Sequence, residues 1–318
     1  MRLEQLSGET TQQKDSNPAL RAVAISEMRG ASQIFEHAQF YSFLGNADTP
    51  KKPAEEAGGS ERAINSDYGA PTVGGPAYGS VALQILGDKI MTDIAYERRG
   101  GNIESERVRE LQSFARGLGR YFIYQHINGT GLNNQIAGLK GLIQAAQTLS
   151  LDGAGAAGQA VPLGNSDANK ALQQAFIEAL DQLIANVGAG AVLEMNAKMI
   201  SRLTAVAREY VQFTSVDGVF GQVMSYNGVP IINAGYSKDK VTPVLPQNEV
   251  VGADANCCSI YCVKFGERED VTIGTNVGLQ VRDLGLVGTQ YTTMVEMDAN
   301  QTILGVNAAW RLKGIKLP

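Results

Sequence analysis

The sequence predicts an α+β fold with two lobes. An amphipathic helical pattern runs over residues 104–127, and a second one covers residues 168–187. Strict two-residue alternation of apolar side chains marks residues 81–96 and 291–313 as strands. Because helices and strands alternate along a chain of 318 residues, a large mixed domain or two interleaved ones is expected.

Composition excludes several classes of protein. The chain is 44% hydrophobic and 19% charged, which is typical of a folded protein. With 32 acidic and 27 basic residues its formal net charge is −5, which disfavours tight, sequence-independent DNA binding. No window of eighteen uninterrupted apolar residues occurs, and residues 1–17 are polar. We therefore expect a protein that neither spans a membrane nor is secreted.

The first 59 residues are expected to form an arm and short helices. Residues 1–17 show no periodicity and predict a flexible arm that ends at Pro18. Residues 19–44 are rich in helix formers and aromatic side chains, which favours one or two helices. Residues 45–59 contain two prolines and paired charges, and we expect an exposed linker there.

Residues 60–98 are predicted to form a long β-hairpin. The stretch 79–96 provides one strand, and residues 62–68 are the expected partner. The turn cluster at residues 70–79 would form the tip, around Gly74-Gly75-Pro76.

The apolar pattern within this segment changes phase. Val81, Leu83 and Ile85 occupy odd positions, whereas Ile90 and the apolar residues after it occupy even ones. Gly87 lies between the two phases, and a glycine at such a change is typical of a bulge or bend.

The remaining elements follow from local patterns. The helix over 104–127 should stop at Asn128-Gly129, a pair suited to a left-handed cap. The helix over 168–187 has Asp167 as its expected N-cap. We further predict a helix at 197–213 and strands at 191–195, 222–226, 229–233, 259–265, 291–297 and 304–312, with Trp310 facing inward in a closing hairpin.

A glycine motif at residues 153–158 matches the dinucleotide-binding fingerprint G-x-G-x-x-G. That fingerprint should follow a strand and open a helix, but here Val161-Pro162 follows and the next helix begins near Ala168. We therefore predict a mobile loop without a nucleotide ligand.

No set of residues for catalysis, cofactor binding or metal binding emerges. Cys257, Cys258 and Cys262 cluster without a nearby histidine, which favours reduced, buried thiols on a strand over a zinc site. The two histidines, His37 and His126, are interpreted as helix-terminal or surface residues. The sequence thus predicts a protein that is not an enzyme and has no cofactor.

The order of elements resembles the tailed-bacteriophage major capsid protein, the Hong Kong ninety-seven type. The resemblance covers roughly residues 18–318 and includes three short segments of low specificity. These are Tyr226-Asn-Gly-Val-Pro-Ile-Ile-Asn233, Phe265-Gly-Glu-Arg-Glu269 and Ala308-Ala-Trp-Arg-Leu-Lys-Gly-Ile-Lys316.

This resemblance implies an N-terminal arm, an extended loop, a peripheral domain with a spine helix at 104–127, and an axial domain. The implied boundaries are 1–59, 60–98, 99–150, 151–275 and, for a C-terminal β segment returning to the peripheral domain, 276–318. The extended loop would contact a neighbouring subunit through Arg62, Tyr68, Tyr78, Val81, Leu83, Ile85 and Gly87.

The implied function is a shell subunit that assembles as hexamers and pentamers around phage DNA, without reading its sequence. Synthesis and assembly would take place in the host bacterial cytoplasm, and the virion would be the final location. Too few residues precede the loop for a fused scaffolding domain, so a separate scaffolding protein or none is implied, besides portal and decoration proteins. No cross-linking lysine and asparagine pair is identified. The same fold builds encapsulins, and fold alone leaves that alternative open.

Overall fold

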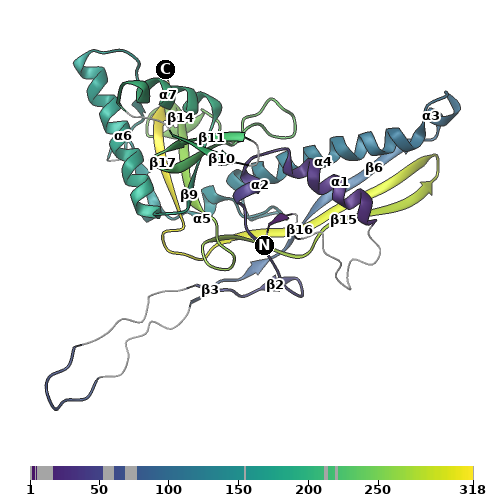
Figure 1. The fold of residues 1–318 in the computed structure, drawn as a ribbon, viewed down its shortest axis with the longest axis horizontal. Helices are drawn as coiled ribbons and strands as arrows, with labels where there is room; N and C mark the ends of the chain where they lie inside the picture. Colours follow the sequence, from purple (N-terminus) through teal and green to yellow (C-terminus); the bar gives the residue numbers. More distant parts are fainter. Residues whose placement is uncertain are drawn as a thin grey trace.

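The computed structural model describes residues 2, 3, 5, 17–52, 61–68, 77–153, 155–210, 214–218 and 221–317. Two lobes lie side by side in Figure 1. An elongated lobe contains the longest helix and a sheet of long strands. A compact lobe contains a larger sheet and two further helices. A loop leaves the elongated lobe and runs away from both.

The elongated lobe is a sheet covered on one face by helices. Its described strands number four, in the order β1-β15-β16-β6. Helices α1 and α4 pack on each other, α1 against β15 and α4 against β6. The elements are α1 (Pro18–Arg29), α2 (Ile34–His37), β1 (Phe40–Ser42), β6 (Gln84–Asp93), α3 (Ala95–Arg98), α4 (Ile103–Asn128), β15 (Val271–Val287) and β16 (Gln290–Ile303).

The long helix α4 confirms the pattern that predicted it. The Asn102 side chain caps its start, with Oδ1 accepting hydrogen bonds from the amides of Glu104 and Ser105. Its predicted left-handed cap is wrong, because Gly129 has φ −58°. A side chain at Gly129 would instead lie 2.1 Å from the Ile136 carbonyl oxygen, so close backbone approach explains this glycine.

The N-terminal segment departs from two expectations. Leu3 is buried in the core, so the arm is not free at that point, while residues 6–16 lie outside the described residues. Two helices are present as predicted, but residues 40–42 form strand β1, parallel to β15. Their aromatic side chains pack into the core in either conformation, which is why the pattern favoured a helix.

The compact lobe is built on a sheet whose described strands number nine. Its main path is β10-β11-β12-β9-β14-β17-β7, with β13 paired to β14 and β8 to β17. The strands are β7 (Thr148–Ser150), β8 (Gln159–Ala160), β9 (Ala191–Met195), β10 (Thr214–Gly218), β11 (Gly221–Tyr226), β12 (Val229–Asn233), β13 (Glu249–Val251), β14 (Asp254–Lys264) and β17 (Ala309–Lys316). The other elements are α5 (Leu139–Leu142), a 3₁₀ turn (Ala145–Gln147), α6 (Asp167–Val187) and α7 (Ala197–Tyr210).

Helices α6 and α7 agree with the predicted ranges over their described lengths, and residues 211–213 lie outside the described part. The cap of α6 is Ser166, whose hydroxyl accepts a hydrogen bond from the amide of Asn169. Asp167 is the first helical residue rather than the cap, which places its carboxylate favourably in the first turn.

The central strands of the compact lobe serve two cores. In β9, Leu193 packs in the same core as α6 and α7, whereas Val192 packs in the core of the elongated lobe. In β14, Cys262 and Tyr261 divide in the same way. Because successive side chains of a strand point to opposite faces, this sheet joins the lobes through continuous packing.

The predicted closing hairpin is wrong. Strand β16 pairs with β15 and β6 in the elongated lobe, but β17 pairs with β14 and β7 in the compact lobe. The C-terminal segment 276–318 is therefore divided between the lobes at a turn near Gly305. Trp310 is half-buried rather than inward-facing, and its Nε1 donates to Asn307 Oδ1 at 3.4 Å.

Candidate assembly surface

The extended loop begins and ends in two short strand pairs. Strand β2 (Ala47–Asp48) pairs with β5 (Val81–Ala82), and β3 (Lys51–Lys52) pairs with β4 (Ala77–Tyr78). The predicted pairing of residues 62–68 with 79–96 is therefore wrong. Residues 45–59, expected to be a linker, supply the partner strands over 47–52. The predicted tip, at residues 74–76, lies outside the described residues.

The subunit itself already buries two of the predicted contact residues. Val81 is 3% exposed and Leu83 is 8% exposed, so neither is available to a neighbour and that expectation is wrong. Ile85 is 70% exposed and stays available. Tyr78 pairs with Lys51 through the backbone. The phase change in the apolar pattern occurs where β5 ends and β6 begins, at Leu83.

Gly87 has a different role from the predicted bend. It lies inside β6, opposite Glu296, in a register without a bulge. A side chain at this position would come within 2.2 Å of the Val295 carbonyl oxygen. Gly87 therefore allows β6 and β16 to approach closely.

Residues 61–68 form a compact turn that lies apart from both lobes (Figure 1). Arg62 Nη1 donates to the Ser66 carbonyl oxygen at 3.0 Å, and the Arg62 guanidinium lies 5.4 Å from the centre of the Tyr68 ring. Asn65 adopts φ 66°, which closes the turn. Ile64 is 92% exposed. Arg62 and Tyr68 are thus brought together as one unit, but not as a strand.

A second exposed apolar group lies at the far end of the elongated lobe and was not predicted. Strands β6, β15 and β16 end there, with Leu286 opposite Tyr291 and Met91 opposite Thr292. The exposed members are Met91, Tyr96, Leu284, Leu286 and Val287. The sequence carries a signal for it, since apolar residues flank the turn glycine Gly288 where a solvated hairpin would have polar ones.

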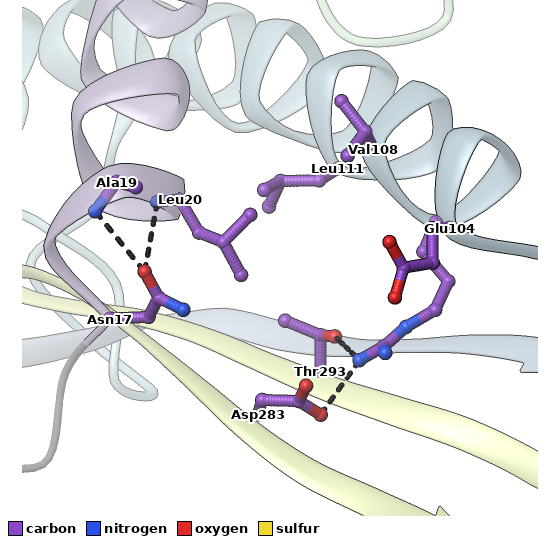
Figure 2. Close-up of a pocket in the computed structure, with 9 residues that line it drawn as sticks. Asn17, Ala19, Leu20, Glu104, Val108, Leu111, Asp283 and Thr293 are labelled. Carbon is purple, nitrogen blue, oxygen red and sulfur yellow. Dashed lines mark hydrogen bonds and ion pairs between the residues drawn. The ribbon is translucent and has the colours of Figure 1, made fainter.

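A pocket of about 280 Å³ opens between α1, α4 and the sheet (Figure 2). Arg107 Nη2 lies 2.7 Å from Asp283 Oδ1 and donates to Thr293 Oγ1 at 3.2 Å. This ion pair depresses the pKa of Asp283 against the opposing effect of burial. Leu20, Val108 and Leu111 form the apolar wall, and Glu104 stands at the rim.

The glycine motif at residues 153–158 is held by two carboxylates. Asp152 accepts hydrogen bonds from the amides of Gly155, Ala156 and Ala157 at 2.5–2.8 Å, and Asp254 accepts one from Gly158. Hydrogen bonds to Ser150 and these amides lower the pKa of Asp152 to about 2. The predicted mobile loop is thus anchored, and the amides that a phosphate would need already have a partner.

The three cysteines are free and buried, as predicted. Burial raises the pKa of Cys258 and of Cys262 to about 12, so neither is a reactive thiolate. His126 is helix-terminal but fully buried, which corrects the expectation of a surface residue. Among the described residues, no group of three or more His, Cys, Asp or Glu side chains is placed to hold a metal ion. Within the same residues, no helix has the length and apolar character needed to cross a membrane.

Comparison with known proteins places this architecture. No protein-family model and no curated protein sequence matches the chain. The holo-SrpI encapsulin of Synechococcus elongatus PCC 7942 is similar in structure, with a TM-score of 0.63 at 12% identity over 89% of this chain and 87% of the other. The capsid of an empty GTA particle gives a TM-score of 0.61 at 15% identity over 90% of each chain.

The procapsid of satellite phage P4 gives a TM-score of 0.53 at 10% identity over 92% of this chain and 98% of the other. Identities this low establish the fold and nothing finer. Each of these three solved chains is matched over nearly its whole length. The chain therefore has the Hong Kong ninety-seven type fold that these capsid and encapsulin shells share.

Proposed function

We propose that this chain is a structural shell subunit, the major capsid protein of a tailed bacteriophage, which assembles with copies of itself around DNA. The observation that carries the proposal is the extended loop. Two short strand pairs anchor it, and its turn at residues 61–68 lies against neither lobe. An isolated two-stranded hairpin is marginally stable in water, so a contact with another subunit would stabilise it.

Contacts of this kind are heterologous, because a loop on one copy meets a different surface on the next. Heterologous contacts that close generate rings. We propose rings of six and five subunits, combined into a closed shell. The surplus of acidic residues suits a wall that encloses DNA without binding every phosphate. A separate scaffolding protein, portal and decoration proteins are further proposed partners, with assembly in the host bacterial cytoplasm and the virion as destination.

An encapsulin-type compartment is the second candidate. The similarity to the Synechococcus encapsulin is as strong as that to the GTA capsid, so fold does not choose between the two functions. Contents separate them: a phage capsid encloses DNA, and an encapsulin encloses a protein cargo.

Sizing and negative-stain microscopy of the purified chain test the proposal. We expect rings or closed particles at micromolar concentration, if necessary after addition of a scaffolding partner. Particles with the absorbance ratio of DNA support a capsid, and particles with a co-purifying enzyme support an encapsulin. A sharp monomer or dimer peak across salt and pH, with a partner supplied, would contradict both.

A further inference from the structure

We propose that the turn at residues 61–68 of one copy docks, through Ile64, into the pocket between α1, α4 and the sheet of a neighbouring copy. This inference rests on the proposed shell function and names the two surfaces that meet. It commits to a second copy of this chain as the occupant of the pocket.

The turn is built to present one apolar side chain. Its own hydrogen bonds close it, since the Ser66 amide and hydroxyl both donate to the Ala63 carbonyl oxygen at 3.2 and 2.8 Å. Arg62 and Tyr68 pack on each other behind it. Ile64 is left 92% exposed at the apex. A preformed turn loses little conformational freedom on binding, which favours its use as a contact.

The pocket matches that turn in size and character. Its volume of about 280 Å³ suits a single branched apolar side chain with part of its backbone. Val108, at 38% exposure, and Leu20 form an apolar wall beside the buried Leu111. Burying an isoleucine side chain against such a wall contributes favourably to association.

Charge at the rim is complementary to the turn. Arg107 is already paired with Asp283, but the described residues provide no ion-pair partner for the Glu104 carboxylate at the rim (Figure 2). Arg62 lies two residues from Ile64 and would meet Glu104 when Ile64 enters the pocket. The bound turn would therefore bring a guanidinium to an unpaired carboxylate.

The occupant must come from another copy. Residues 61–68 lie beyond the end of the compact lobe in Figure 1, whereas the pocket lies on the other side of the molecule, between α1 and the N-terminal half of α4. A subunit therefore cannot fill its own pocket with its own turn. Repeated from copy to copy, this contact is heterologous and closes rings.

Disulfide trapping tests the contact. The double variant Ile64→Cys with Val108→Cys should, on mild oxidation of assembled particles, give covalent oligomers up to closed rings of five and six. Ile64→Cys with Val306→Cys, another exposed position, is the matched control and should give none. The native cysteines are buried and will not compete. Particles that form without the specific cross-link overturn the docking and leave the shell function intact.

Charge reversal provides a second readout that requires no cysteine. Arg62→Glu or Glu104→Arg alone should raise the concentration needed for assembly about fivefold, the equivalent of ~1 kcal/mol per contact. The double reversal should restore assembly. Absence of rescue overturns the pairing, as does a Val108 cysteine that links instead to residues 6–16 of its own chain. If the native chain forms no particles at all, the proposed function fails and this inference fails with it.

Discussion

Nε2 of His126 lies 3.3 Å from Oε1 of Glu194, and both side chains are fully buried where the two lobes meet. Gln301 fixes the histidine tautomer. Its Nε2 donates to the His126 carbonyl oxygen at 2.7 Å, so its Oε1 faces His126 Nδ1 at 2.5 Å and accepts that proton. Nδ1 therefore carries a hydrogen, and the second proton is shared between Nε2 and Glu194.

Removal of one partner should be costly. His126→Ala leaves the Glu194 carboxylate buried without its ion pair, and loss of one member of a buried pair typically costs about 3–5 kcal/mol. His37→Ala, at a half-buried histidine of α2, is the matched control and should cost clearly less. Urea unfolding followed by circular dichroism measures both, and equal losses would contradict a structural role for the pair.

Stability should depend on pH through this pair. Burial lowers the pKa of His126, but the Glu194 carboxylate and the Gln301 hydrogen bond outweigh it and leave the pKa raised. Stability from a raised pKa is fully present below the unfolded value, about 6.5, and is lost as pH rises through the folded value.

In Glu194→Gln the charge partner is gone, so burial favours neutral His126 and stability falls below about pH 6.5 instead. The native chain should therefore exceed this variant in melting temperature by more at pH 6 than at pH 9. A difference that does not change with pH would contradict the ion-pair assignment.

Two glycines of α4 should respond in opposite directions to alanine. A side chain at Gly119 would lie 2.7 Å from the Met28 carbonyl oxygen in α1, whereas one at Gly117 would meet nothing within 4 Å. Gly119→Ala should destabilise the subunit by about 1–3 kcal/mol through overpacking. Gly117→Ala should stabilise it by up to about 1 kcal/mol through helix propensity. Denaturant midpoints decide, and a shared sign would contradict the packing of α1 on α4.

Asp152 should hold the glycine motif over a wide pH range. With its pKa lowered to about 2, it stabilises the folded loop above pH 4 and loses that effect only as pH falls through about 2. Asp152→Asn should speed amide exchange at Ala156 and Ala157, with Asp167→Asn as the exposed control. Nucleotides should leave the melting temperature unchanged, and a saturable rise would show a ligand site after all.

Sequence patterns predicted the elements better than their partners. Helix α4 and strand β9 were recognised because their periodicity is local. The loop was misread because strands pair through space, and residues 47–52, interrupted by prolines, gave no alternation. Strand β15 was missed because polar and glycine residues, such as Thr272 and Gly274, alternate with few apolar ones.

The candidate contact residues show the same limit. Exposed Ile64 and buried Val81 are both apolar residues in a region expected to be extended, and only the tertiary pairing distinguishes them. The pocket around Arg107 joins α1, α4 and two distant strands, so no local pattern could indicate it.

The most direct test of the account removes the loop and nothing else. Lys52 and Ala77 lie opposite each other in the β3–β4 pair, so a four-residue Gly-Ser turn can replace residues 53–76 without disturbing either lobe. Negative-stain microscopy should show rings or closed particles for the native chain and only dispersed subunits for the truncated one, with unchanged circular dichroism and melting. Intact particles from the truncated chain would contradict the claim that this loop joins one subunit to the next.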